Sequence, residues 1–205
     1  MEAVTQPVVE WGVASTTLVG EARSGDRHLV RIESDFVLIA AVDGLGHGDE
    51  AAEVAQTAIR TLESASARSV IALLNRCHEH LLGSRGAVMS LAVFTPADSS
   101  ITWTGVGNVE GLLLRASPNA SPRYESLGLR SGVVGARLPL VHAAILQVMR
   151  GDTLVFATDG IRSDFMDKLT AVGHPQQLAD RVMAQCYKGT DDALVLVVRC
   201  LGGSP

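Results

Sequence analysis

Four aspartates in this chain stand where a carboxylate could do chemistry. Asp43 and Asp159 each follow a strongly apolar run and precede a glycine, whereas Asp26 and Asp191 each precede a predicted strand. If adjacent strands carry them, all four side chains converge on one end of the sheets. Uncompensated carboxylates at that density repel one another, so a shared cation is the economical explanation. Taken singly, each aspartate is explained equally well as a turn or capping residue.

The residue types around these acids favour a hard divalent ion. Ligation by oxygen alone selects Mg²⁺ or Mn²⁺ over zinc. His78 and His80 are two residues apart on a predicted helix and therefore face apart. The three cysteines (Cys77, Cys186 and Cys200) have no CxxC spacing and fit buried thiols in a reducing cytosol.

Asp43 directly follows an unbroken run of apolar residues. Seven apolar residues, 36–42, run without a break into Asp43-Gly44-Leu45-Gly46-His47-Gly48. This pattern predicts a strand buried on both faces and then a tight glycine turn. A helix from Glu50 to Ser64 should follow, with acidic residues in its first turn. An acidic strand-to-helix turn without a chemical role remains the alternative for this stretch alone.

The remaining elements predict a single domain over residues 1–205. Helical patterns cover 68–82, 161–169 and 175–187, a meander of strands covers 87–115, and a last apolar strand covers 193–200. This order favours an α+β fold, a four-layer α-β-β-α sandwich of two mainly antiparallel sheets flanked by helices.

Composition excludes several functional classes. The net charge is −5 with a pI near 5.6, which argues against a nucleic-acid partner. No apolar stretch approaches the roughly 20 residues that cross a bilayer, and no signal peptide is evident, so we expect a cytoplasmic protein without membrane partners. Nucleotide binding at residues 44–48 is disfavoured because the spacing is not GxGxxG.

Five motifs together resemble the PPM family of metal-dependent Ser/Thr protein phosphatases, over about residues 9–199. They occur in the family's order: Ser24-Gly25-Asp26, Asp43-Gly44-Leu45-Gly46-His47-Gly48, Gly105-Val106-Gly107-Asn108, Ala157-Thr158-Asp159-Gly160 and Asp191-Asp192-Ala193. Within the family the chain looks most like the small bacterial branch that acts on stress and sporulation switches, and in particular like a stand-alone feedback phosphatase.

The resemblance implies two metal ions, Mn²⁺ or Mg²⁺. Asp43 would bridge them, with the Gly44 carbonyl and Asp26 at the second ion and Asp159 and Asp191 at the first. A water between the ions would attack phosphorus in line, without a phospho-enzyme. Asp43 and Asp159 are the residues that the resemblance puts at the chemistry.

Two departures from the family pattern concern substrate contacts. Many members carry a histidine directly after the Asp-Gly, whereas this chain has Leu45 there and His47 two residues later. His47 is therefore a candidate substrate contact or proton donor, or else simply part of the turn or helix start. Arg23 is a candidate phosphate ligand at a shorter spacing than usual, or else an ordinary solvated loop arginine.

The resemblance also implies the partners: phosphorylated STAS-domain proteins of a stressosome, with negative feedback on a general stress response. The lack of a sensor domain before Val8 favours this type over the multidomain phosphatases of anti-sigma-factor antagonists. A catalytically inactive docking module is the competing class. Four clustered carboxylates argue against that class, because a docking surface has no need of them.

Overall fold

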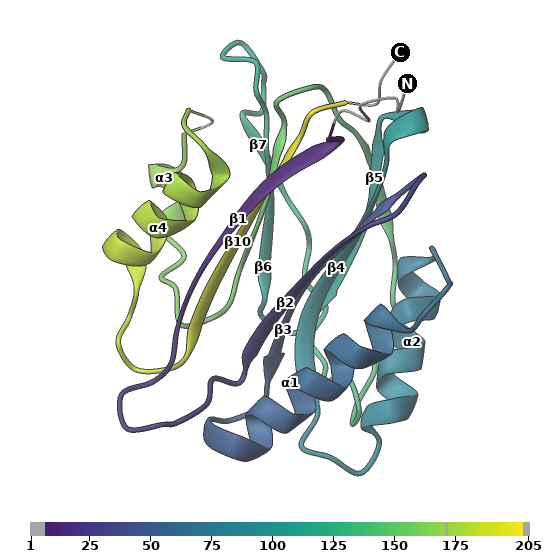
Figure 1. Cartoon of the computed structure of the whole chain (residues 1–205), viewed down its shortest axis with the longest axis vertical. Coiled ribbons are helices and arrows are strands. Elements are labelled where there is room, and N and C mark those ends of the chain that lie inside the picture. Colours follow the sequence, from purple (N-terminus) through teal and green to yellow (C-terminus); the bar gives the residue numbers. More distant parts are fainter. Residues whose placement is uncertain (1–6, 171, 203–205) are drawn as a thin grey trace, which may run out of the picture.

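The computed structural model of the chain describes residues 7–170 and 172–202. In this part of the chain two five-stranded sheets face each other, and helices cover both outer faces (Figure 1). All neighbouring strands run antiparallel. The predicted four-layer α-β-β-α sandwich is confirmed.

Each sheet has one N-terminal strand at its edge, and we name the sheets after these edge strands. The β1 sheet has the order β1-β10-β9-β6-β7. Its strands are β1 (Val9–Thr16), β10 (Ala193–Cys200), β9 (Thr153–Ala157), β6 (Glu110–Leu114) and β7 (Tyr124–Ser126). The β2 sheet has the order β2-β3-β4-β5-β8. Its strands are β2 (Asp26–Ile32), β3 (Val37–Gly44), β4 (Ala87–Thr95), β5 (Ser100–Val106) and β8 (Ala144–Gln147).

The helices divide between the two outer faces. Helices α1 (Gly48–Glu63) and α2 (Val70–Leu81) pack on the β2 sheet, and α4 (Pro175–Cys186) packs on the β1 sheet beside the short α3 (Phe165–Lys168). A 3₁₀ turn, η1 (Pro96–Asp98), joins β4 to β5. Of the described helices, none is long and apolar enough to cross a membrane.

Strand β3 is buried on both faces, as its unbroken apolar run predicted. Leu38, Ala40 and Val42 pack beneath α1 and α2, and their neighbours Val37, Ile39 and Ala41 pack between the sheets. This alternation follows from the two-residue period of a strand. All six residues have no measurable exposure, so both layers of core hold β3 in place. The carboxylate that ends this strand is therefore rigidly positioned.

One predicted helix is mostly wrong. Only Phe165–Lys168 of the expected 161–169 segment is helical. The residues before it bond to the chain that leaves α4: Ile161 forms a β-bridge with Tyr187, and the Arg162 amide donates to the Cys186 carbonyl at 2.8 Å. These tertiary hydrogen bonds replace the first helical turn. The helix predicted to begin at Pro175 is confirmed.

The core between the sheets yields a stability prediction. A methyl group on Gly111 would lie 2.1 Å from Cζ2 of Trp103, which is fully buried and tilted against Phe156 at a centroid distance of 6.0 Å. Gly111→Ala should therefore lower the free energy of unfolding by about 1–3 kcal/mol, measured by urea denaturation. Gly128→Ala is the control, since nothing lies within 4 Å of its added methyl group. Equal stability of the two variants would contradict this packing.

Candidate active site

Asp26 and Asp43 lie directly opposite each other on β2 and β3. They are register partners in the antiparallel pair, where the Cβ atoms of facing residues are about 4.5–5.5 Å apart. Asp26 is only 4% exposed, and its amide donates to Ser24 Oγ at 3.0 Å. A buried carboxylate, Asp26, thus faces a half-buried one, Asp43, at the end of the most buried strand.

This pair is costly to ionise. Burial, and after it the charges of Asp26, Asp159, Asp191 and Asp192, raise the pKa of Asp43 to about 9. Burial also raises the pKa of Asp26 to about 7; a hydrogen bond from Thr158 opposes the rise, and neighbouring aspartates add to it. Carboxyl groups whose pKa values are raised this far are typical of functional sites, and a nearby positive charge would favour their ionised form.

Asp159 and Asp191 reach the same end of the molecule from the β1 sheet. Asp159 follows β9, and its Oδ2 accepts a hydrogen bond from Asn108 Nδ2 at 2.8 Å. Asp191 precedes β10, which pairs with β9, and its Oδ1 accepts from the Asp192 amide at 2.8 Å. Burial, the largest cause, and the charges of Asp159 and Asp192 raise the pKa of Asp191. All four predicted aspartates therefore act electrostatically on one another.

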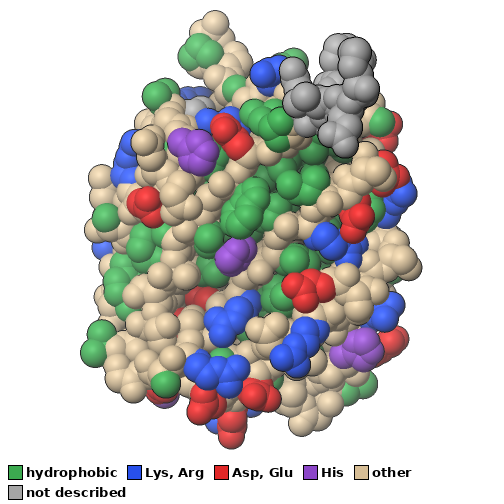
Figure 2. Space-filling view, viewed as in Figure 1, with side chains coloured by type: hydrophobic (Ala, Val, Ile, Leu, Met, Phe, Trp, Pro, Cys, Tyr) green, Lys and Arg blue, Asp and Glu red, His purple; other side chains and the backbone are tan. Residues whose placement is uncertain are grey.

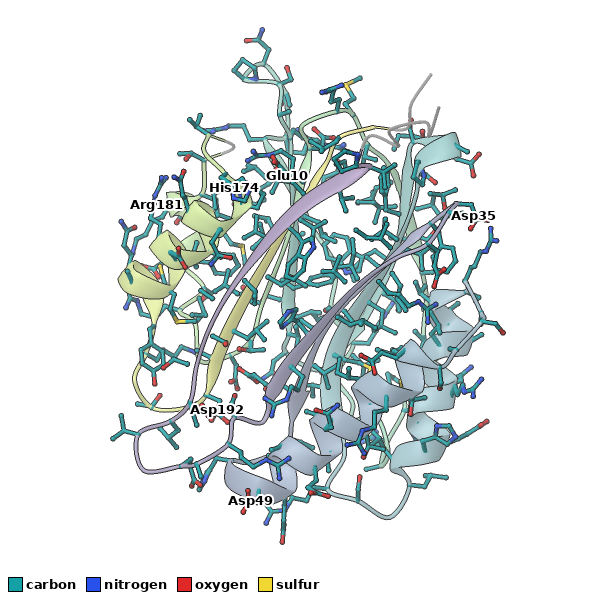
Figure 3. The ribbon with its side chains drawn as sticks, viewed as in Figure 1. Glu10, Asp35, Asp49, His174, Arg181 and Asp192 are labelled. Atoms are coloured by element: carbon teal, nitrogen blue, oxygen red, sulfur yellow. The ribbon has the colours of Figure 1, made fainter. Side chains whose placement is uncertain are left out.

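Two side chains, Thr158 and Asp192, link the sheets by hydrogen bonds next to this acidic cluster. Thr158, on the chain leaving β9, donates from Oγ1 to Asp26 Oδ2 at 2.7 Å. Asp192 accepts from the Leu18 amide at 2.7 Å and from the Gly25 amide at 2.6 Å, so it holds the β1–β2 loop (Figure 3). Gly25 in turn accepts a hydrogen bond from the Gly44 amide at 3.1 Å.

Asp192 is the important residue that sequence reasoning did not assign. The motif Asp191-Asp192-Ala193 predicts a ligand role for Asp191 only. Asp192 is 4% exposed, and both its carboxylate oxygens are used by backbone amides 167 and 174 residues away. Nothing in the local sequence reveals such distant partners.

The carboxylate oxygens of the cluster suit a hard divalent ion. The side chains are not arranged, however, in the geometry of a complete metal site. Within the ranges 7–170 and 172–202, no three His, Cys, Asp or Glu side chains form a ready-made metal-ligand group. Asp26 and Asp159 are instead engaged by Thr158 and Asn108. Facing buried carboxylates with raised pKa values are the oxygen ligands that Mg²⁺ and Mn²⁺ prefer.

The two predicted substrate contacts lie at the rim of the cluster. Arg23 is part-exposed and pairs with Asp49 at 3.6 Å and Glu53 at 3.5 Å. His47 is exposed and occupies the N-cap position of α1 without a side-chain capping hydrogen bond, and its Nδ1 lies 2.6 Å from Glu21 Oε1. Neither side chain bonds to the four aspartates, but His47 acts weakly on the charge of Asp191.

The role of Asp192 can be tested by removing one acceptor. Asp192→Asn keeps the size of the side chain but replaces one of the two acceptor oxygens with an NH2 group, so either the Leu18 or the Gly25 amide loses its acceptor. We expect a loss of about 1–3 kcal/mol in the free energy of unfolding, because a buried backbone donor loses its partner. Urea denaturation measures the loss. Asp98→Asn, an exposed acid at η1, is the control and should leave the stability unchanged.

The raised pKa of Asp43 predicts a pH dependence of stability. In chelator, the folded protein keeps the Asp43 proton up to about pH 9, whereas the unfolded chain releases it near 3.8. The folded state thus binds more protons between these values, and stability should fall as the pH rises through this window. Asp43→Asn should weaken that fall in melting temperatures recorded from pH 5 to pH 9. Parallel curves for the variant and the parent would contradict the burial of this carboxyl group.

Comparisons with protein families and with known proteins point to a sporulation protein family and to a phosphoserine phosphatase. The family model described as stage II sporulation protein E (SpoIIE) matches residues 33–201. Phosphoserine phosphatase RsbX of Bacillus subtilis (strain 168) is 25% identical over 142 residues, which span 69% of each protein.

Two solved structures have the same fold over nearly the whole chain. One comes from work on the bacterial stressosome as a modular system adapted to control secondary messenger signalling. It has a TM-score of 0.82 and 26% identity, and the match covers 93% of this chain and 99% of that one. The other, RsbX in complex with magnesium, has a TM-score of 0.84 at 19% identity and covers 98% of both chains. The chain therefore belongs to the SpoIIE family of PPM-type serine/threonine phosphatases, as its motifs predicted.

Proposed function

We propose that this chain is a phosphoprotein phosphatase of the RsbX type. It would remove phosphate from Ser or Thr of STAS-domain proteins in a stressosome, in the cytoplasm, and so provide negative feedback on a stress response. The reaction consumes one water and yields inorganic phosphate and the free hydroxyl group. The P–O bond to the side chain breaks as the bond to the water oxygen forms.

The observation that carries this proposal is the facing pair of Asp26 and Asp43. A family fold alone would be compatible with an inactive docking module. A docking surface, however, has no use for two buried carboxylates whose pKa values are raised to about 7 and about 9. Such a pair destabilises the fold at neutral pH unless a cation offsets it. Retention of the pair favours a metal-dependent enzyme.

The residues proposed to hold two Mn²⁺ or Mg²⁺ ions are those assigned from the motifs. Asp43 would bind both ions. Asp26 and the Gly44 carbonyl would complete the coordination of one ion, and Asp159 and Asp191 would complete that of the other. When bound, the ions would lower the pKa of a water and stabilise charge on the phosphoryl group. RsbX itself was solved with magnesium, which supports a divalent ion here without choosing between the two metals.

The protein's own residues would orient these ligands. Thr158 holds one oxygen of Asp26, and Asn108 holds one oxygen of Asp159. The Lys188 ammonium donates to the Asp159 carbonyl oxygen at 2.5 Å, which fixes the turn after β9. Hydrogen bonds of this kind around ligands typically sustain metal affinity.

The substrate would be held at the rim. Arg23 is proposed to contact the substrate phosphate, and His47, steadied by Glu21, is proposed to contact the substrate near its leaving oxygen. Both side chains are accessible, so they can meet a folded protein partner.

The similarity to a structure from work on the stressosome supports the choice of partner. That structure is also 26% identical to this chain, slightly more than RsbX of Bacillus subtilis over its aligned residues. The phosphorylated STAS-domain protein is therefore the substrate to test first.

Activity on an aryl phosphate with Mn²⁺ tests the chemistry. Asp43→Asn should lower kcat/KM by roughly 100-fold or more, because several kcal/mol of charge stabilisation depend on the ions. Asp98→Asn is the matched control and should retain full activity. Phosphorylated STAS-domain proteins then test the substrate, with loss of phosphate read by mass.

Metal binding is checked separately by thermal melting. Mn²⁺ should raise the melting temperature through preferential binding to the folded state, and Asp159→Asn should blunt that rise. Absence of turnover on every phosphoprotein, with a normal fold, would favour the docking-module alternative. An undiminished Mn²⁺ response in Asp159→Asn would count against its role as a ligand.

A further inference from the structure

A charged pocket lies beside the acidic cluster, and apart from Arg23 its residues have no role in the chemistry proposed above. It has a volume of about 610 Å³ and lies between the β1–β2 loop, the first turns of α1 and the α2–β4 loop. We call it the Arg23–Arg85 pocket; its charged residues are Arg23, Asp49, Glu50, Glu53 and Arg85. Figure 2 shows basic and acidic side chains intermingled at this end of the molecule, and Figure 3 marks Asp49 on the first turn of α1.

The pocket is joined to the loops that carry the aspartates. Arg23 is three residues before Asp26 in the same loop. On the other side, the Leu45 amide donates to the Gly86 carbonyl at 3.1 Å, which ties the Arg85 loop to the turn after Asp43. A methyl group on Gly46 would lie 2.7 Å from Arg85 Nη1, so the guanidinium lies directly over that turn. A peptide bound at the aspartates could therefore extend into this pocket.

The two arginines pair with exposed acidic side chains at the surface, Arg23 loosely and Arg85 closely. Arg23 reaches Asp49 and Glu53 only at 3.6 and 3.5 Å, beyond the roughly 2.7–2.9 Å of a good charge-assisted hydrogen bond. Arg85 pairs with Glu50 through Nε, and its Nη1 lies over Gly46. The arginine side chains are 40% and 51% exposed, and their acidic partners are at least 70% exposed. Pairs of this kind contribute little to stability and are readily exchanged.

These properties favour an anionic ligand. A guanidinium offers five N–H donors in a planar fork that matches a carboxylate or phosphate, and Arg23 uses only one long hydrogen bond within the described chain. An incoming anion can therefore bind Arg23 without first breaking a strong internal contact, and it can bind the Nη atoms of Arg85 while Nε stays paired with Glu50. Asp49, Glu50 and Glu53 line the same pocket, so the preference for an anion rests on these guanidinium donors.

We propose that the Arg23–Arg85 pocket receives an acidic side chain of the substrate that lies near the phosphorylated residue, with Arg85 as its main ligand. The inference rests on the proposed phosphatase function and adds a determinant of substrate choice to it. Arg85 is a specificity residue here, because it binds a flanking group of the substrate and not the reacting phosphate.

The test uses two fluorescent peptides with a non-hydrolysable phosphonate in place of phosphoserine. They differ only in the flanking residues, which are glutamate in one and glutamine in the other. With Mn²⁺ present, anisotropy should give about tenfold tighter binding of the acidic peptide, as expected for charge-assisted hydrogen bonds at one site. Arg85→Gln should abolish this preference, and Arg85→Lys should retain part of it.

Arg60→Gln is the matched control, because it removes one exposed positive charge from α1 outside the pocket and should keep the tenfold preference. Melting temperatures verify that each variant is folded. Equal binding of the two peptides to the parent protein, or an unchanged preference in Arg85→Gln, would overturn the inference. Turnover of an aryl phosphate by the same preparation reports the phosphatase function independently, so failure of one proposal is distinguishable from failure of the other.

Discussion

The arrangement of this site depends on the free-energy cost of removing two facing carboxylates from water. Asp26 and Asp43 occupy paired positions on the two strands that lead into and out of one tight turn, and the surrounding core leaves little water to solvate them. Hydrogen bonds from nearby groups reduce this free-energy cost. Thr158 donates to one carboxylate, and backbone amides donate to both oxygens of Asp192. A divalent cation would stabilise the ionised carboxylates further.

The site depends on the contact between the two sheets as much as on either sheet alone. The β2 sheet supplies Asp26 and Asp43, whereas the β1 sheet supplies Asp159 and Asp191. Core packing between the sheets, centred on Trp103 and Phe156, sets their separation. Asp192 then fixes the β1–β2 loop against the start of β10. Long-range packing and short-range hydrogen bonds therefore both position the carboxylates.

Sequence patterns predicted much of this arrangement because its strongest signals are local. The apolar run before Asp43, the glycine turn after it and the amphipathic pattern of α1 are each readable within about 25 residues. The layer architecture followed from the order of such elements and from the family motifs.

The errors and omissions concern contacts that span the chain. Residues 161–164 satisfy their backbone groups with the chain that follows α4, so a short periodic pattern there did not give a helix. Asp192 binds amides in a loop near the other end of the sequence. Arg85 lies over Gly46 through a loop pairing that no periodicity reveals. Propensity and spacing carry no information about partners of this kind.

The pairing of β1 with β10 has a consequence for biosynthesis. The first described strand leaves the ribosome early, but its only partner in the described sheet is the last strand of the fold. Asp191 and Asp192 stand immediately before that last strand, so a nascent chain that ends before them lacks one aspartate of the acidic cluster and the clamp on the β1–β2 loop. The β1–β2 loop would thus become fixed only late, after translation of β10.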